Sequence, residues 1–538
     1  MASVSFSKNE LEALLGRKIK MSELESILPS MGLPIESIEG EKLQVDVTPN
    51  RPDLLSVEGI ARAFSTFTGG KAKQYSMRDS GVKLHVDNSV LPVRPFIVGA
   101  VVRNIKLDEP SIESLMQLQE KIHETYGRKR RKISIGVHNF DAIQPPFYYK
   151  AVEPDSFSFV PLDMSKKLTL SKILEVHPKG KEYGSILEGC RKYPLLLDSK
   201  GQALSFPPII NGELTRVSKK TRNIFIDVTG TDANAIMDAL RIVALSLVDR
   251  GGELLSVEVV GKRKLKTPDL RERIAELQVE KINKMLGVKF SEAQVLKLLA
   301  KMGYTTGRKL KVPCYRVDVM GWVDLAEDVA IAYGYNNFKP SLPNFFSIGQ
   351  EKPSELLEGR VREILVGLDF LEVICQNLTN EKECFEKMLI AEKPHVKIKN
   401  PKVGESTMMR TWLPPSLLKV LSESRHAELP IRIFEIGDAL SLEGAHAKES
   451  RNLVCALYHP KASFSEIKSI AEALIREMGW EVGMRAAEHP SFIKGRAAEL
   501  VYRKKRVGVI GEIHPQVLNN FQLEQPAVVL ELDLTSFF

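Results

Sequence analysis

The chain has 538 residues, of which 43% are hydrophobic, and a formal net charge of +8 at pH 7. At roughly 150 residues per domain, this length predicts about three to four domains. We expect neither a membrane protein nor a secreted one, because no apolar stretch approaches the roughly 18 residues of a membrane span and the first residues lack a signal core. The five cysteines include no Cys-x-x-Cys pair, which argues against zinc and disulfide frameworks and favours a cytoplasmic location.

Residues 1–80 are predicted to form a helix–strand–helix module, which residues 269–345 repeat. In both copies, apolar residues at i, i+3, i+4 and i+7 precede a glycine: Leu24, Ile27, Leu28, Met31 and Gly32; Val295, Leu298, Leu299, Met302 and Gly303. This spacing is an apolar stripe on an amphipathic helix, and the glycine can take the left-handed conformation that ends it. A short strand, an Arg-x-Asp turn and a second helix follow in each copy. The sequence therefore predicts a duplicated module.

The second copy carries an acidic cluster that the first lacks. Asp324, Glu327 and Asp328 lie at i, i+3 and i+4, so their carboxylates share one helix face, and Asp318 comes from the preceding turn. Hard oxygen ligands of this kind suit Mg²⁺ better than zinc. A second interpretation stays open, since Asp324 and Glu327 have the spacing of a helix capping box.

Between the two copies, residues 84–260 are predicted to be rich in β-strands, with one long helix at 233–248. Two apolar segments in this region carry polar side chains, and a histidine lies upstream of them; together these make a candidate binding pocket: Ser205, Asn211, Asp227, Thr229 and His138. Asn211-Gly212 and Thr229-Gly230 are also turn signals, so an ordinary loop role is the alternative for each. No Ser-His-Asp or Cys-His order stands out, and we therefore expect no covalent nucleophile.

Residues 353–538 predict an antiparallel sheet that carries a few helices. The expected fold class is thus α+β and multidomain: two helix–strand–helix modules, a β-rich domain and a C-terminal sheet domain.

Several long motifs, in this order, resemble the phenylalanyl-tRNA synthetase β subunit family of the archaeal and eukaryotic type. The resemblance is carried by residues 48–62 in the first copy and by residues 315–335 in the second, and it extends over essentially the whole chain. It implies that residues 84–260 are a tRNA-editing domain and that residues 353–538 resemble the class II synthetase core. It also implies that Asp318, Asp324, Glu327 and Asp328 bind Mg²⁺.

The function implied by the resemblance has two parts. With an α subunit, the chain would attach phenylalanine to tRNA(Phe) using ATP, as a heterotetramer of two α and two β subunits. Its own domain would hydrolyse mischarged Tyr-tRNA(Phe). Such editing has a physical basis, because an apolar pocket rejects an added hydroxyl only weakly, by about a hundredfold.

The C-terminal domain lacks the arginines of class II chemistry. Residues 432–437 resemble class II motif two, but Ile433 stands where that motif has an arginine for the ATP α-phosphate. Residues 508–514, the nearest candidate for motif three, contain an acid and a histidine instead of its arginine. We therefore expect no aminoacylation site on this chain, with ATP and phenylalanine bound through the α subunit.

Two other functions remain open from the sequence. One is a free-standing tRNA-editing hydrolase, against which the catalytically empty C-terminal domain argues. The other is a non-catalytic tRNA-binding protein, which the acidic cluster and the candidate pocket disfavour. The basic run Arg128–Lys132 is either a solvated surface or a patch for RNA.

Overall fold

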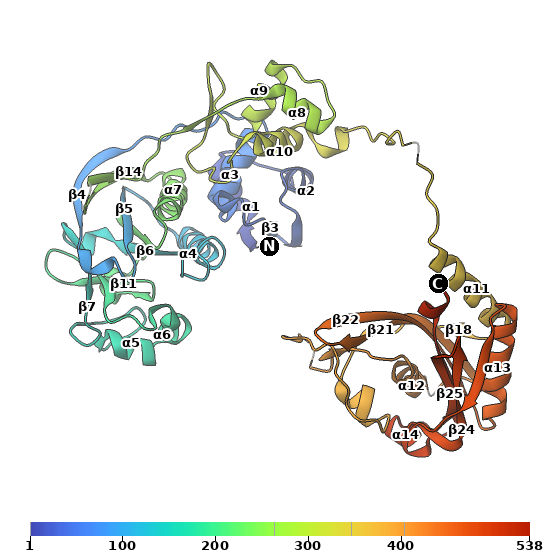
Figure 1. Ribbon diagram of the computed structural model, residues 1–538. Helices are drawn as coiled ribbons and strands as arrows, with labels where there is room; N and C mark the ends of the chain where they lie inside the picture. Colours follow the sequence, from blue (N-terminus) through green and yellow to red (C-terminus); the bar gives the residue numbers. More distant parts are fainter. Residues whose placement is uncertain (1, 263, 346, 403, 425) are drawn as a thin grey trace. The chain divides into compact units, whose positions relative to one another are not determined.

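The computed structural model describes every residue except Met1, Arg263, Phe346, Val403 and Arg425. The chain forms two compact units, residues 1–342 and residues 343–538, which are coloured blue to yellow and yellow to red in Figure 1.

The N-terminal unit begins with the first module. Strands β1 (Ala2–Ser7), β2 (Ile35–Glu39) and β3 (Lys42–Val47) form a sheet of order β1-β3-β2, accompanied by helices α1 (Lys8–Leu15), α2 (Met21–Ser30) and α3 (Val57–Phe67). Helix α1 ends at Gly16, which has φ +67°, and the chain reverses after α2 at Gly32, which has φ +82°. Both glycines occupy the left-handed region that favours this residue.

The second module has the same order of elements with one strand fewer. It comprises β16 (Arg273–Ala275), α8 (Val279–Leu286), α9 (Glu292–Lys301), β17 (Leu310–Val312) and α10 (Trp322–Tyr333). Helix α8 ends at Gly287 with φ +67°, and Gly303 follows α9 with φ +87°. The matched glycines of the two copies thus have nearly the same backbone conformation.

A ten-stranded mixed sheet forms the middle of the N-terminal unit. Nine strands run in the order β12-β11-β10-β7-β4-β14-β5-β13-β6, and β15 pairs with β14. The bounds are β4 (Arg78–Val86), β5 (Phe96–Arg103), β6 (Ile133–Asn139), β7 (Phe147–Val152), β10 (Tyr193–Leu197), β11 (Ala203–Phe206), β12 (Ile210–Asn211), β13 (Ile224–Gly230), β14 (Glu253–Val260) and β15 (Lys264–Thr267). The sheet therefore extends beyond the expected range 84–260 at both ends, because β4 and β15 both pair with β14.

Two helices cover one face of this sheet. Helix α7 (Ala233–Asp249), at the predicted position of the long helix, packs on β5 and β13, and α4 (Glu109–Glu124) packs beside it on β6 (Figure 1). Their buried residues belong to the same hydrophobic core as those of α1, α2 and α3. The first module and the sheet are therefore one packed body. The short helices α5 (Leu170–Val176) and α6 (Pro178–Tyr183) lie outside this core.

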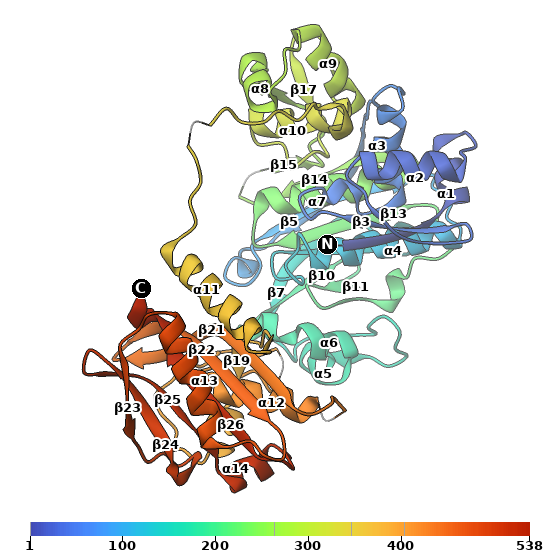
Figure 2. The same cartoon turned by 90° about the vertical axis from the view of Figure 1, so that its right-hand side faces the viewer.

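The C-terminal unit is a seven-stranded sheet between helices. Its strand order is β18-β21-β22-β26-β25-β24-β23, antiparallel except for the β18–β21 pair. The bounds are β18 (Leu371–Glu372), β21 (Ile431–Glu443), β22 (His446–Tyr458), β23 (Val482–Ala486), β24 (Phe492–Tyr502), β25 (Lys505–Ile513) and β26 (Ala527–Asp533). One face packs against α11 (Pro353–Gly367) and α13 (Phe464–Glu477), as Figure 2 shows for α13, and the other against α12 (Pro414–Glu423) and α14 (Pro515–Asn520).

Candidate functional site

A cavity of about 230 Å³ opens in the N-terminal unit between α4, β6, β11, β12 and β13. Ser205, Asn211 and Asp227, three of the five residues predicted to form a pocket, line it. In the sequence, strand β12 and a loop separate Ser205 from Asp227, and the fold brings the two residues to one cavity. The cavity therefore brings together the main part of the predicted polar cluster.

The register of β6 and β13 sets the position of Asp227. In this antiparallel pair Asp227 is opposite Gly136, and Phe225 is opposite His138. A Cβ atom on Gly136 would lie 2.2 Å from Asp227 Oδ1 and 2.7 Å from His138 Nε2, far inside van der Waals contact. Only glycine therefore allows the carboxylate and the imidazole to meet across this position.

His138 lies behind the cavity wall and connects two groups that line it. Its Nε2 is 2.6 Å from Asp227 Oδ1, and its Nδ1 is 2.8 Å from Thr215 Oγ1. The imidazole is fully buried, and Asp227 and Thr215 are each 1% exposed. Thr215 lines the cavity beside Asp227, although the sequence analysis did not single it out.

Ser205 and Asn211 face each other on neighbouring strands. They are opposite residues in the β11–β12 pair, and Asn211 Nδ2 donates to the Val137 carbonyl over 3.4 Å. Ser205 is 3% exposed, and its Oγ has no hydrogen-bond partner within the described residues. A buried hydroxyl without a partner costs about 1–3 kcal/mol, so this wall of the cavity favours a ligand that supplies a hydrogen bond.

Thr229 lies outside this lining, contrary to the expectation for it. It is fully buried, its hydroxyl accepts from Arg94 Nε at 2.9 Å, and its carbonyl accepts from Arg94 Nη2 at 2.9 Å. Burial lowers the pKa of Arg94 to about 10. Thr229 therefore holds a buried arginine behind the cavity and does not contact its interior.

The basic run Arg128–Lys132 contributes one residue to the cavity. Arg130 is buried, and its Nη1 donates to the Ile209 carbonyl at 2.9 Å while its Nη2 donates to Glu120 at 2.6 Å. Burial opposes ionisation of Glu120, but the hydrogen bond to His123 and the charge of Arg130 outweigh it and lower its pKa to about 2. The run is thus neither wholly solvated nor wholly available to RNA, because Arg130 supports the cavity wall.

The predicted acidic cluster is divided among different partners. Arg316, which is buried, donates to Asp318 at 2.8 Å and to Asp328 at 2.7 Å through Nη2, and Tyr304 donates to Asp328 at 2.5 Å. Burial opposes ionisation of Asp318, but the hydrogen bond and charge of Arg316 outweigh it and lower its pKa.

The remaining two acids lie at the start and on the surface of α10. Asp324 Oδ2 accepts the backbone N–H groups of Met320 and Gly321, each at 2.7 Å, so Asp324 caps α10 from within its first turn and Gly321 is the N-cap residue. The expected capping box of Asp324 with Glu327 is therefore wrong, because the helix begins three residues earlier than that box requires. Glu327 is exposed on the same helix. The four carboxylates are therefore not gathered as ligands of one ion: two pair with Arg316, one caps a helix, and one faces solvent.

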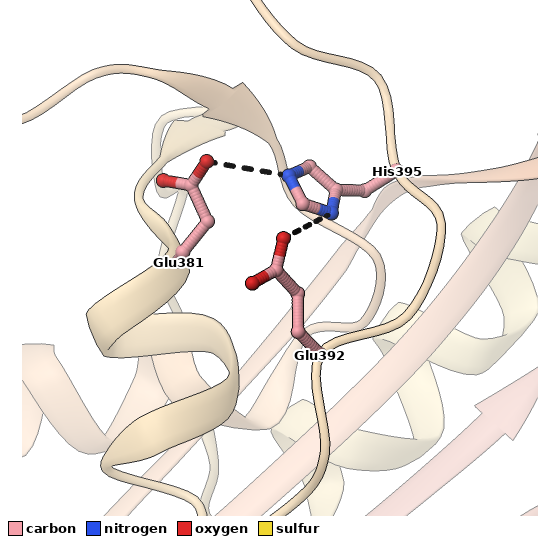
Figure 3. A group of neighbouring side chains, drawn as sticks. All are labelled: Glu381, Glu392 and His395. Atoms are coloured by element: carbon pink, nitrogen blue, oxygen red, sulfur yellow. Dashed lines mark hydrogen bonds and ion pairs between the residues drawn. The ribbon is translucent and has the colours of Figure 1, made fainter.

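Another acidic group occurs in the C-terminal unit. The ligand atoms of Glu381, Glu392 and His395 lie within 4.8 Å of one another. Figure 3 shows the two carboxylates pointing toward the imidazole. His395 Nδ1 is 2.7 Å from the Lys393 carbonyl, which leaves only Nε2 for a further ligand. Lys397 Nζ already lies 3.2 Å from Glu381 and 3.5 Å from Glu392. A lysine therefore supplies the positive charge that a metal ion would bring.

In the C-terminal sheet, residues of the two segments compared with class II motifs, 432–437 and 508–514, have packing roles. Ile433 is 3% exposed, and nearby Glu435 accepts from Arg410 Nη2 at 2.8 Å. A Cβ on Gly508 would lie 2.2 Å from the Glu531 carbonyl oxygen, and one on Gly511 would lie 2.7 Å from the Phe492 ring. These glycines therefore allow close packing of β25 against its neighbours.

Within the described residues, no helix is both long and apolar enough to span a membrane.

Three family models match the chain: "Phe-tRNA synthetase beta subunit B1 domain" over residues 1–70, "tRNA synthetase B5 domain" over 275–335, and "Phenylalanyl tRNA synthetase beta chain CLM domain" over 339–534.

Curated relatives match over their whole length. The phenylalanine–tRNA ligase beta subunit of Archaeoglobus fulgidus is 44% identical, covering 100% of this chain and 99% of that protein. The beta subunit of Thermococcus sibiricus is 40% identical, and the match covers 100% of this chain and 99% of that protein. The beta subunit of Methanocaldococcus jannaschii is also 40% identical, and the match covers 99% of this chain and 100% of that protein. A crystal structure of an N-terminal fragment of the phenylalanyl-tRNA synthetase beta subunit from Pyrococcus horikoshii is similar with a TM-score of 0.60 and 40% identity, covering 62% of this chain and 99% of the fragment.

Proposed function

This chain belongs to the phenylalanine–tRNA ligase beta subunit family, and on that premise we propose how its parts divide the work of the enzyme. It serves as a subunit in the synthesis of Phe-tRNA(Phe). Its partner is an α subunit, which carries the aminoacylation site and binds ATP and phenylalanine. The assembly is a heterotetramer of two α and two β subunits, and we assign it to the cytoplasm. The support for an external active site is Ile433, an apolar buried residue at the position where ATP needs an arginine.

The isolated chain is accordingly expected not to form phenylalanyl-adenylate. Pyrophosphate exchange measured on the purified chain and on the complex tests this assignment. A rate for the chain alone that equals the rate of the complex contradicts it, whereas activity restored by the α subunit supports it.

The cavity lined by Ser205, Asn211 and Asp227 is the proposed editing site for Tyr-tRNA(Phe), within an editing domain of about residues 84–260. One observation carries this proposal: a buried carboxylate lines a cavity in which Ser205 Oγ has no partner among the described residues. Asp227 uses Oδ1 for His138, so Oδ2 is available to accept a hydrogen bond from the hydroxyl that distinguishes tyrosine from phenylalanine. A site built to bind a hydroxyl rejects the analogue that lacks it far more strongly than an apolar pocket rejects the reverse.

Deacylation of Tyr-tRNA(Phe) by the complex tests the editing site. Asp227→Ala and Asn211→Ala should slow it while leaving Phe-tRNA(Phe) formation nearly unchanged. Asp198→Ala is the matched control, since Asp198 is 1% exposed, belongs to the same sheet region and lies outside the cavity lining. If both cavity variants deacylate Tyr-tRNA(Phe) as fast as the parent, the site is wrongly placed.

The surface around α11 and β18 is the proposed docking site for the α subunit. Val366 at the end of α11 is 61% exposed, Leu371 on the edge strand 68%, and Ile374 just beyond it 91%. Large apolar side chains that are exposed together mark interaction surfaces, and the open edge of β18 offers unpaired backbone groups beside them. Ile374→Asp should weaken association with the α subunit, whereas Ile348→Asp, at a residue 92% exposed outside this surface, should not.

Magnesium is proposed to bind the second module through two of the four acids. Mg²⁺ usually takes one or two carboxylates and keeps several waters, and Glu327 with the free oxygen of Asp324 meets that requirement. Asp318 and Asp328, held by Arg316, would orient the module around these two. A bound ion would offset the negative charge of α10 at this corner. Its remaining ligands would be water or the partner subunit.

A further inference from the structure

The hydrogen-bond chain that runs from Thr215 through His138 to Asp227 has a use beyond holding the cavity wall. Two of its members line the cavity, and the third, His138, is fully buried between them. Its order is hydroxyl, imidazole, carboxylate, with distances of 2.8 and 2.6 Å. His138 and Asp227 were expected at the pocket, but Thr215 was not: it comes from the short 3-10 helix Glu213–Thr215, whereas its partners come from β6 and β13.

The geometry supports two protonation states of His138. In one, Nε2–H donates to Asp227 and Nδ1 accepts the Thr215 hydroxyl hydrogen. In the other, the imidazole carries both protons, and the Thr215 hydrogen turns to the Gly212 carbonyl, which lies 3.1 Å from its oxygen. In both states the two imidazole nitrogens and the Thr215 hydroxyl are hydrogen-bonded. Asp227, at 2.6 Å, supplies the negative charge that a buried imidazolium needs.

We propose that Thr215 is the general base group of the editing site and that His138, a positioning residue, stores the proton that Thr215 passes on. This rests on the proposed editing function. The attacking water bonds to the ester carbonyl carbon while its proton moves to Thr215 Oγ, and the Thr215 proton moves to His138 Nδ1. The ester C–O bond then breaks, and the proton returns by the same path to the departing ribose oxygen. No other reactant is consumed, and no acyl group is attached to the protein.

The surroundings of His138 are consistent with this role. The Phe225 ring is stacked 6.1 Å away, which excludes water from that side. Behind Asp227 lies Arg94, whose charge acts on that carboxylate. The other charged or titratable groups around the cavity line its far walls: Glu120, Arg130, Asp163, His177, Lys179 and Arg216.

Single-turnover deacylation of Tyr-tRNA(Phe) by the complex tests the relay. Thr215→Val keeps the shape and removes the hydroxyl, and should lower the rate constant about a hundredfold, the lower range of general base catalysis, with little change in KM. Thr215→Ser should restore most of the rate. His138→Gln can still donate to Asp227 but cannot take up a proton, and should lower the rate constant about as much as Thr215→Val does. Thr267→Val is the control, because Thr267 is equally buried and bonded to Gly99 outside the cavity.

The outcomes separate the relay from the editing function itself. If the parent complex deacylates Tyr-tRNA(Phe) no faster than buffer, the editing proposal falls and the relay with it. If the parent is active and Thr215→Val slows it no more than Thr267→Val, or His138→Gln keeps the parental rate, the relay alone is refuted. A tyrosyl group trapped covalently on Thr215 also refutes it, since that result makes the residue a nucleophile.

Discussion

The two copies of the helix–strand–helix module share one contact and differ in what surrounds it. Arg51 donates to both carboxylate oxygens of Asp53, each at 2.9 Å, and Arg316 donates to those of Asp318 at 2.9 and 2.8 Å. Only in the second copy does the arginine also bind an acid of the following helix, Asp328. The shared turn is thus a structural unit in its own right, to which the second copy adds charge.

The difference lies in the helix that follows the turn. When Glu58-Gly59-Ile60-Ala61 is aligned with Glu327-Asp328-Val329-Ala330, Gly59 stands where Asp328 does. A Cβ on Gly59 would lie 1.7 Å from the Asp53 carbonyl oxygen, so the first copy cannot accommodate that aspartate. Glu58 is buried and bonded to Ser114 and Arg250, whereas Glu327 is exposed. The matched glutamate is therefore part of the packing in the first copy, as Glu58, and presents its carboxylate to solvent in the second, as Glu327.

The largest expected effect distinguishes the two arginines. Arg316→Met leaves two buried carboxylates, those of Asp318 and Asp328, without their cationic partner. It should lower the free energy of unfolding by about 3–5 kcal/mol. Arg51→Met leaves only Asp53 without its hydrogen-bonded arginine and should lower the free energy of unfolding by less. Urea unfolding, with amide exchange in α10 and α3 to localise the loss, measures both. Adding Asp328→Asn to Arg316→Met should recover part of the loss. Equal costs for the two arginine variants would remove the asymmetry that we describe.

The next effect tests the glycine that replaces the aspartate. Gly59→Ala places a methyl group against the Asp53 carbonyl and should cost about 1–3 kcal/mol through overpacking. Gly321→Ala, before α10, is the matched control: its φ of −160° suits any residue and its Cβ would meet nothing within 4 Å. Gly321 is the N-cap residue of α10, where alanine is less favourable than glycine, so that change should cost no more than about 1 kcal/mol. A Gly59→Ala protein as stable as the parent would show that the first copy tolerates a side chain there.

The helix caps should contribute similarly in the two copies. Ser56 Oγ accepts from the Gly59 N–H at 3.3 Å, and Asp324 accepts two N–H groups before α10. Ser56→Ala and Asp324→Ala should each cost about 1 kcal/mol. Asp324→Asn should lose less, because its amide oxygen can still accept. Amide exchange at the first turns of α3 and α10 reports each cap separately, and unchanged exchange in Asp324→Ala would rule out the capping role.

The smallest effect concerns magnesium. When the free Mg²⁺ concentration equals the dissociation constant of the site, binding of the ion adds about 0.4 kcal/mol to the free energy of unfolding. Glu327→Gln should abolish this gain in thermal melting of the complex. Glu58→Gln in the first copy should retain it, even though the variant is less stable overall. A gain of the same size in Glu327→Gln and the parent would exclude Glu327 as a ligand.

Local patterns predicted much of the architecture. The apolar spacing before Gly32 and Gly303 correctly indicated a helix followed by a left-handed glycine, and the long helix at 233–248 was found as Ala233–Asp249. The edge strand of the C-terminal sheet, β18, is only Leu371–Glu372. It lies at a sheet edge with a single neighbour, so pairing ends where β21 no longer accompanies it.

The candidate site was predicted less completely. Asp227 and Thr229 lie on the same face of β13, two residues apart, and alternation alone treats them alike. One faces the cavity, and the other faces Arg94, 135 positions earlier in the chain. Thr215 was missed because its partner His138 is 77 residues away, and nothing in the local sequence of either residue records the other.

The sequence alone was enough to predict the duplicated module, the acid content of its second copy and the family. These depend on residue identity and short-range spacing, which the chain carries explicitly. Only the tertiary structure decided which acids pair with Arg316, that Gly136 makes room for Asp227 and His138, and that Thr215 joins them. The physical reason is that strand register and burial follow from contacts between distant segments, and a carboxylate's role depends on whether those contacts bring it a cation, a backbone N–H or water.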